Sequence, residues 1–341
     1  MNDNVILSLE GLSAGYGGSN TISNINLSLT AGEALCVVGQ SGCGKSTLLK
    51  SVMGVFDKPV ITGGDIVFDG CRLYELSQKR RCALTTSGMG FIFQTPGAAF
   101  NPIRSYKKQF IETLKSQGKY EKEAFLPSVR DVFSKLDLPD CERILASCPY
   151  EMSGGMNQRI ALALVMLMQQ KLLLADEPTS ALDAVTRRNV ADELIAMRTD
   201  CGIAQMIVTH DFALASYVAD RIAVMYAGDI VELGTCDEVF YDPRHPYTWA
   251  LLSSLPQLGT KDEPLYSIQG TPPNLFHEVK GDAFAPRNPK ALKIDFVERP
   301  PFFEVTPTHY ARTWLMDPRA PKVEPPEHVR ILREKGVNRV G

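Results

Sequence analysis

Short apolar runs separated by polar and glycine-rich segments recur up to about residue 240. Residues 33–38 and 171–175 are nearly continuous apolar runs, which is typical of strands buried on both faces of a parallel sheet. Residues 91–93 and 205–209 predict two further short strands, and segments beginning at residues 47 and 156 predict helices. This alternation predicts an α/β fold around a parallel sheet, with an antiparallel part near the N-terminus.

The middle and the end of the chain depart from this alternation. Residues 95–159 have a helical pattern, with apolar positions inside charged segments near residues 110–114 and 129–133. Most of the 22 prolines follow Pro243, so we expect no long helix there and an irregular, turn-rich extension. The predicted parts are a core of residues 1–94 and 160–240, a helical subdomain of residues 95–159 and a C-terminal extension of residues 241–341.

A glycine-rich segment follows the first buried strand. Residues 39–47 match the phosphate-loop pattern GxxxxGK[ST] and stand between a predicted strand and a predicted helix. The glycines let backbone N–H groups turn toward a phosphate, and the helix N-terminus adds its positive dipole end. Lys45 is placed to reach the β- and γ-phosphates of ATP, and Ser46 to hold Mg²⁺. The predicted nucleotide contacts in this loop are Gly39, Ser41, Gly42, Cys43, Gly44, Lys45, Ser46 and Thr47.

Cys43 lies inside this loop, beside a lysine and backbone amides that could lower the pKa of its thiol. On that hypothesis, alkylation of Cys43 blocks ATP binding and ATP protects the thiol. The alternative is an inert small side chain.

Polar side chains follow three other predicted strands. Asp176 and Glu177 come at the end of residues 171–175, where a parallel sheet binds its ligands, so Asp176 is predicted to hold Mg²⁺ through water. Glu177 is predicted to orient or deprotonate the attacking water, although a helix-capping role is an alternative for Glu177. His210 is placed to contact the γ-phosphate or the attacking water, and Gln94 to reach Mg²⁺ or water.

Residues 153–158, Ser-Gly-Gly-Met-Asn-Gln, stand between the phosphate loop and the acidic strand end. Alone, a Ser-Gly-Gly run is typical of a turn. Followed by a predicted helix, the Ser153 hydroxyl and the Gly154 and Gly155 amides form a second donor-rich anion site.

In this order, the motifs resemble the complete set of ABC-transporter ATPase subunits. The resemblance covers roughly residues 1–240 and implies a P-loop NTPase core with an antiparallel β subdomain and an inserted helical subdomain. It also implies a head-to-tail ATP sandwich, in which each phosphate loop faces the Ser-Gly-Gly motif of a partner. The resemblance further assigns nucleotide contacts to Ser153, Gly154, Gly155 and Gln158, an intersubunit contact to Asp183 in the turn of residues 180–183, and adenine stacking to Tyr16. An exposed loop aromatic is the alternative for Tyr16.

The extension sharpens the resemblance, because residues 241–248 and 281–287 resemble the C-terminal region of dipeptide, oligopeptide and nickel importer ATPases. This implies two integral membrane permease subunits, an external solute-binding protein and a second ATPase subunit, for which the resemblance favours a paralogue while an identical copy stays open. In that subfamily, cysteines in this region often hold an iron–sulfur cluster, where this chain has Asp282, Asn288, Asp295 and Thr313. Oxygen side chains are poor ligands for such a cluster, so we expect none, and we interpret Asp282, Asn288 and Asp295 as polar surface.

Composition limits the other classes of function. The net charge is −3, which gives no basic field for nucleic acid, and the eight scattered cysteines form no CxxC pair, which favours reduced thiols. The longest apolar stretch, residues 160–168, is too short to cross a bilayer, and no secretory segment opens the chain. We therefore expect a peripheral protein at the cytoplasmic face of the cell membrane.

Several alternatives stay open at this point. Importers of nickel, metal chelates or opines would have the same motifs as an importer of peptides. A soluble ABC-type ATPase of translation or DNA repair is disfavoured, because the chain has one motif set, no long heptad stretch and an importer-like extension. A P-loop kinase for a small molecule leaves residues 153–158 unexplained.

Overall fold

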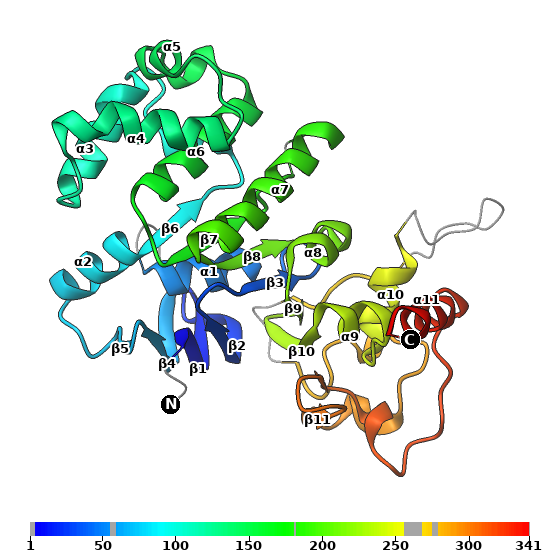
Figure 1. The fold of residues 1–341 in the computed structure, drawn as a ribbon. Coiled ribbons are helices and arrows are strands. Elements are labelled where there is room, and N and C mark those ends of the chain that lie inside the picture. The colour runs from blue at the N-terminus through cyan, green and yellow to red at the C-terminus, as the bar shows by residue number, and fades with distance from the viewer. Residues whose placement is uncertain (1–3, 55–58, 181, 256–267, 275–278, 341) are drawn as a thin grey trace.

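The computed structural model describes residues 4–54, 59–180, 182–255, 268–274 and 279–340. Two sheets form the core, a group of helices lies at one end, and the C-terminal extension lies beside the core at the other (Figure 1). The division of the chain into domains stays a prediction.

An antiparallel sheet forms the amino-terminal part of the core. Its strand order in the described part of the chain is β2-β1-β4-β5. Alternate residues of β2 are buried, among them Ile25, Leu27 and Leu29, so one face of this sheet is apolar and packs inward. The strands are β1 (Val5–Tyr16), β2 (Ser19–Thr30), β4 (Val60–Phe68) and β5 (Cys71–Arg72).

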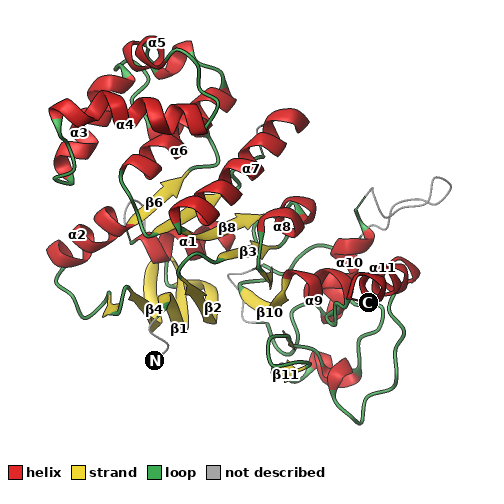
Figure 2. Cartoon of the chain, viewed as in Figure 1, coloured by secondary structure: helices red, strands yellow, loops and turns green. Residues whose placement is uncertain are grey.

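The second sheet is mixed and carries the predicted parallel strands (Figure 2). Its order in the described residues is β11-β12-β10-β9-β3-β8-β7-β6, and the five strands from β9 to β6 are parallel. The remaining three pair antiparallel, and β11 and β12 come from the extension. The bounds are β3 (Ala34–Val38), β6 (Met89–Ile92), β7 (Leu172–Asp176), β8 (Ala204–Thr209), β9 (Arg221–Tyr226), β10 (Asp229–Thr235), β11 (Phe303–Glu304) and β12 (Tyr310–Ala311).

Both faces of the mixed sheet are buried, which explains its continuous apolar strands. In β3, Leu35 and Val37 pack toward the antiparallel sheet, whereas Cys36 and Val38 pack into a second apolar core on the other face. Helix α1 shares the first core, and α6, α7 and α8 share the second. The helices of this part of the chain are α1 (Lys45–Met53), α2 (Gln78–Gly88), α6 (Gly154–Leu167), α7 (Ala184–Cys201) and α8 (Phe212–Val218).

The helical subdomain contains α3 (Tyr106–Ser116), α4 (Lys122–Lys135) and α5 (Cys141–Ala146). Aromatic side chains form its interior, and the rings of Phe110 and Phe133 lie 6.2 Å apart. The predicted boundary between residues 159 and 160 is wrong, because α6 continues through it. Ser153 caps α6, and no helix-breaking residue follows Gly155, so one helix belongs to both the subdomain and the core.

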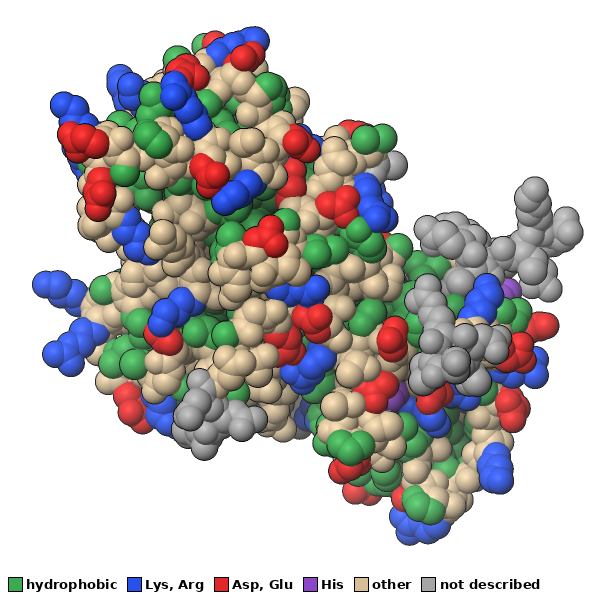
Figure 3. Space-filling view, in the orientation of Figure 1, with side chains coloured by type: hydrophobic (Ala, Val, Ile, Leu, Met, Phe, Trp, Pro, Cys, Tyr) green, Lys and Arg blue, Asp and Glu red, His purple; other side chains and the backbone are tan. Residues whose placement is uncertain are grey.

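The extension is less irregular than its prolines predict. It contains α10 (Pro246–Ser253) and α11 (Glu327–Val340), and α9 (Cys236–Tyr241) leads into it. The expectation that it lacks a long helix is wrong for α11, which begins directly after the last proline, Pro326, and therefore keeps all its backbone donors. None of the described helices has the length and apolar composition that crossing a membrane requires. Charged side chains of both signs are interspersed over the face shown in Figure 3.

Candidate nucleotide site

The predicted phosphate loop joins β3 to α1. Gly42 and Gly44 have φ angles of 81° and 109°, in the left-handed region that favours glycine. A Cβ atom at Gly39 would lie 2.2 Å from the Met225 carbonyl oxygen, so the loop packs too closely on β9 for a side chain there. The glycines of this pattern are therefore required by the backbone itself.

Lys45 is buried at the start of α1, with 6% of its surface exposed. Its Nζ donates hydrogen bonds to the carbonyl oxygens of Gly39 (2.7 Å) and Gln40 (3.1 Å), and lies 3.9 Å from Glu177 Oε1. The ammonium group is thus held inside the loop, where phosphate oxygens could replace the carbonyls as its partners.

Ser46 and Asp176 meet as the sequence predicts. Ser46 Oγ donates to Asp176 Oδ1 at 3.1 Å, across 130 positions of sequence. Burial raises the pKa of Asp176 above its usual range, and the hydrogen bond from Ser46 opposes that rise. A hydroxyl and a carboxylate oxygen side by side are hard ligands of the kind that Mg²⁺ prefers, so these residues fit the ion.

Glu177 begins the turn after β7 and is held in an uncommon backbone conformation, with φ of 49°. Its N–H donates to the Val208 carbonyl at 2.9 Å, which fixes the turn to the neighbouring strand β8. His210 Nδ1 lies 2.9 Å and 2.8 Å from the two carboxylate oxygens of Glu177, and Thr209 Oγ1 donates to Glu177 Oε2 at 3.4 Å. The structure therefore brings Glu177 and His210 together, with Thr209 as a partner that the sequence did not indicate.

Gln94 and Tyr16 make no hydrogen bond or ion pair with these groups within the described part of the chain. Gln94 comes two residues after β6, whose parallel pairing with β7 puts it at the same sheet edge as Asp176, and its side chain is exposed. Tyr16 ends β1 and is 38% exposed. Their roles toward Mg²⁺, water and adenine stay predictions.

The Ser153 motif lies at the start of α6. Ser153 Oγ accepts a hydrogen bond from Met156 N–H at 3.3 Å, and a Cβ atom at Gly154 would meet nothing within 4 Å. A Cβ atom at Gly155 would lie 2.7 Å from Thr186 Cγ2, at the start of α7. Among the described residues, no hydrogen bond or ion pair joins this motif to residues 39–47, and both Ser153 and Gly154 are exposed.

Gln158 and Asp183 are the two remaining predicted contacts, and the structure gives a local role to Asp183. Gln158 is 1% exposed, so its predicted contact with nucleotide has no support from its placement and stays a prediction. Asp183 caps α7, because its carboxylate accepts hydrogen bonds from the N–H groups of Val185 and Thr186, both at 3.1 Å. Ala181, in the same turn, lies outside the described residues.

The hypothesis of a reactive Cys43 is wrong in its physical basis. The side chain is buried, with 6% of its surface exposed, and burial raises the pKa of the thiol, although Lys45 and nearby N–H groups act in the opposite direction. The structure favours an inert small side chain, which belongs to the same apolar core as Val37 and Leu48.

The polar residues of the extension are not at its surface, so that interpretation is wrong. Asp282, Asn288, Asp295 and Thr313 are all buried, and burial raises the pKa of Asp282 to about 6. Each accepts a hydrogen bond from a backbone N–H two residues later, or three residues earlier for Asp295. In a segment with little regular secondary structure, these side chains satisfy backbone groups that no helix or sheet pairs.

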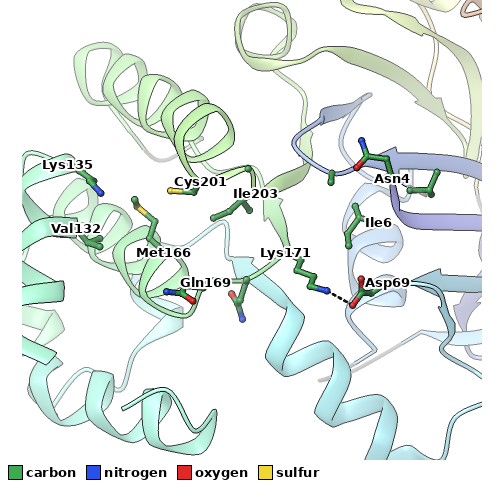
Figure 4. Close-up of a pocket in the computed structure, with 14 residues that line it drawn as sticks. Asn4, Ile6, Asp69, Val132, Lys135, Met166, Gln169, Lys171, Cys201 and Ile203 are labelled. Atoms are coloured by element: carbon green, nitrogen blue, oxygen red, sulfur yellow. Dashed lines mark hydrogen bonds and ion pairs between the residues drawn. The ribbon is translucent and has the colours of Figure 1, made fainter. Parts of the chain in front are cut away.

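A cavity of about 560 Å³ lies away from this site (Figure 4). Lys171 and Ile203 line it just before β7 and β8, at the opposite edge of the sheet, and Lys171 Nζ pairs with Asp69 Oδ2 at 2.6 Å. The cavity is therefore not part of the nucleotide site.

Comparison with known proteins shows the family to which this chain belongs. Residues 22–180 match the family model described as "ABC transporter", and residues 231–294 match "Oligopeptide/dipeptide transporter, C-terminal region". The chain is similar to the oligopeptide transport ATP-binding protein OppD of Bacillus subtilis (42% identity, 95% of this chain and 91% of that protein). It is also similar to the dipeptide transport ATP-binding protein DppD of Lactococcus lactis (39% identity, 92% and 90%).

Solved structures show the same core. The chain is similar to cbiO1 from Clostridium perfringens, part of the ABC transporter complex cbiONQ (TM-score 0.61, 26% identity, 70% of this chain and 92% of that one). It is also similar to the ATP-binding cassette MJ0796 in a dimeric post-hydrolysis state with ADP and Pi (TM-score 0.60, 25% identity, 68% and 99%). Fold and site thus define a transport ATPase of the ABC class. The chain belongs to the family of oligopeptide and dipeptide transport ATP-binding proteins.

Proposed function

We propose that this chain hydrolyses ATP at a paired-subunit interface and thereby powers the uptake of peptides through a membrane importer. The names of the relatives and the match of residues 231–294 support peptides over nickel, metal chelates or opines. The observation that carries the proposal is the cluster of Lys45, Ser46, Asp176 and Glu177 at the carboxyl edge of the parallel strands.

The geometry suggests how the chain's own residues act. Lys45 and the loop N–H groups bind the β- and γ-phosphates, and Glu177 orients a water against the γ-phosphorus. The water oxygen forms the new P–O bond, the bond to the β,γ-bridging oxygen breaks, and ADP leaves with that electron pair. The water proton passes to Glu177 and then to phosphate. His210, 2.8 Å from the carboxylate, keeps Glu177 pointed toward the site.

Mg²⁺ fits the donor set of this site. Ser46 and Asp176 would hold it, with Gln94 as a further oxygen ligand. When bound, the ion neutralises charge on the phosphate oxygens.

The partners are part of the proposal. The open donors of Ser153, Gly154 and Gly155 face the phosphates held by a second ATPase subunit, most simply a paralogue, and Asp183 contacts the opposite site. Closure of the paired subunits moves two integral membrane permease subunits, which receive solute from an external binding protein. The chain then works as a peripheral protein at the cytoplasmic face of the cell membrane.

Reconstitution of the complete complex in proteoliposomes tests the proposal. With ATP inside, we expect uptake of a labelled oligopeptide and no uptake of nickel, a metal chelate or an opine by the same vesicles. Nickel or opine uptake without peptide uptake would reject the substrate, and failure of this chain to copurify with hydrophobic membrane subunits would reject the importer role.

A further inference from the structure

The C-terminal extension reaches the phosphate loop at Gln40. Tyr247, in α10, is fully buried, and its hydroxyl oxygen accepts a hydrogen bond from the Gln40 N–H at 2.9 Å. Arg287, which ends the short 3₁₀ helix η4 (Ala285–Arg287), donates from Nη1 to Gln40 Oε1 at 2.9 Å. These partners are 207 and 247 positions away from Gln40 in the sequence.

Gln40 is therefore held through its N–H group, its carbonyl oxygen and its side-chain oxygen. Its N–H is bound by Tyr247, its side-chain oxygen by Arg287, and its carbonyl oxygen by Lys45 Nζ at 3.1 Å. The same Lys45 Nζ donates to the Gly39 carbonyl at 2.7 Å. Because these contacts set the orientation of the peptide groups around Gln40, they also set where the Lys45 ammonium group lies.

The groups that hold Gln40 are themselves firmly placed. Arg287 is 8% exposed and also donates to Tyr226 Oη (3.2 Å) and to the carbonyls of Gln269 (2.9 Å) and Ile268 (3.3 Å). The rings of Tyr226 and Tyr247 lie 4.5 Å apart. The Arg287 guanidinium is already fixed by several hydrogen bonds, and the Tyr247 ring is fixed by packing. Both side chains therefore lose little conformational freedom when they bind Gln40, so the contact is preorganised.

The extension also borders the space beside the loop. A cavity of about 420 Å³ lies there, and its lining combines the loop and β9 with part of the extension. From the extension, Pro272, Pro273 and Asn274 line this cavity together with Gln40 and Ser41 of the loop.

We infer that Tyr247 and Arg287 are positioning residues of the ATP site, which hold Gln40 so that the phosphate loop and Lys45 are arranged for nucleotide before it binds. This inference rests on the proposed function, in which residues 39–47 bind the phosphates of ATP. Neither residue touches the reacting atoms, because both act through Gln40. By linkage, bound nucleotide stabilises the docked extension by the same factor as docking strengthens nucleotide binding.

The Tyr247→Phe variant removes one hydroxyl and keeps the ring. In the assembled full-length complex, we expect the KM for ATP to rise by about 3- to 10-fold, the range for loss of one buried hydrogen bond, with kcat within twofold of wild type. The matched control is Tyr310→Phe, whose hydroxyl donates to the Pro307 carbonyl within the extension. We expect the control to leave KM and kcat unchanged.

Arg287 is tested together with its acceptor. Arg287→Met and Gln40→Ala should each weaken ATP binding by roughly 10-fold, and Arg287→Lys should restore part of the loss. The double variant should lose no more than either single variant, because both remove the same contact. Arg319→Met, at a side chain that is 86% exposed, is the matched control. Equilibrium ATP binding and thermal unfolding are measured on every variant.

Gln40→Ala leaves the interior of the extension untouched, so it decides the question even if Arg287→Met fails to fold. ATP affinity within twofold of wild type in both Gln40→Ala and Tyr247→Phe would overturn the inference, as would fully additive losses for Arg287→Met and Gln40→Ala. Absence of ATP binding by the wild-type complex would instead reject the proposed function.

Discussion

The phosphate loop and the Ser153 motif are both glycine-rich segments at the start of a helix, but the structure treats them differently. In the loop, Lys45 is buried and bonded to two carbonyls, and Ser46 is bonded to Asp176. At the other motif, Ser153 is exposed, and the space in front of Gly154 is open. The phosphate loop makes its polar contacts within its own chain, whereas the Ser153 motif is exposed. Under the proposed function, a second subunit supplies the nucleotide that the donors of this motif bind, and four substitutions test this.

The largest expected effect is at Glu177, within the completed site. Glu177→Gln keeps the size of the side chain and its place beside His210 but removes the base. Steady-state hydrolysis by the complex should fall by about 100- to 1,000-fold, while ATP binding persists and an ATP-bound pair of subunits accumulates. Phosphate release and size-exclusion chromatography with ATP measure these outcomes. Normal turnover would end the assignment of Glu177 as the base.

Lys45→Ala tests the phosphate loop. The substitution removes charge-assisted hydrogen bonds to phosphate, so equilibrium ATP binding by the isolated chain should weaken by roughly 10- to 100-fold. Lys50→Ala, one turn further along α1 and outside the loop, is the matched control and should bind ATP as wild type does. Equal affinity in the two variants would contradict the site.

Ser153→Ala tests the exposed Ser153 motif. ATP binding by the isolated chain should not change, but hydrolysis by the assembled complex should fall by about 3- to 10-fold, because one hydrogen bond to the partner's nucleotide is lost. Ser153→Thr keeps a hydroxyl and serves as the control. If Ser153→Ala weakened ATP binding by the isolated chain, the motif would belong to the same site as the loop.

The smallest effect separates two roles of Asp183. As the cap of α7, it should add to the free energy of unfolding, and Asp183→Ala should lose that contribution while Asp183→Ser largely keeps it. Chemical denaturation measures this term. If Asp183 also contacts the opposite site, both variants should slow hydrolysis by the complex, whereas a rate restored fully by serine would leave only the capping role.

Much of the site could be predicted because its chemistry depends on short-range order. The loop needs glycines at fixed spacing, and Asp176, Glu177, Gln94 and His210 follow apolar strands whose carboxyl ends meet at one sheet edge. For Cys43, the sequence predicts the wrong direction of the pKa shift. Its neighbours in sequence suggest that the thiolate is stabilised by charge, whereas burial dominates the pKa of the thiol. The burial of Asp282 could not be predicted either, since a polar residue between turns carries no signal of which segments pack over it.

By itself, the sequence determined the order of the motifs, the parallel core and the class of chemistry, because glycine spacing and apolar runs act within a few residues. Only the tertiary structure decided that β11 and β12 extend the main sheet, and that Tyr247 and Arg287 hold the phosphate loop. The contacts of Tyr247 and Arg287 with Gln40 join residues more than 200 positions apart. They depend on how the extension packs against β9 and β10, and no local pattern of residues encodes that packing.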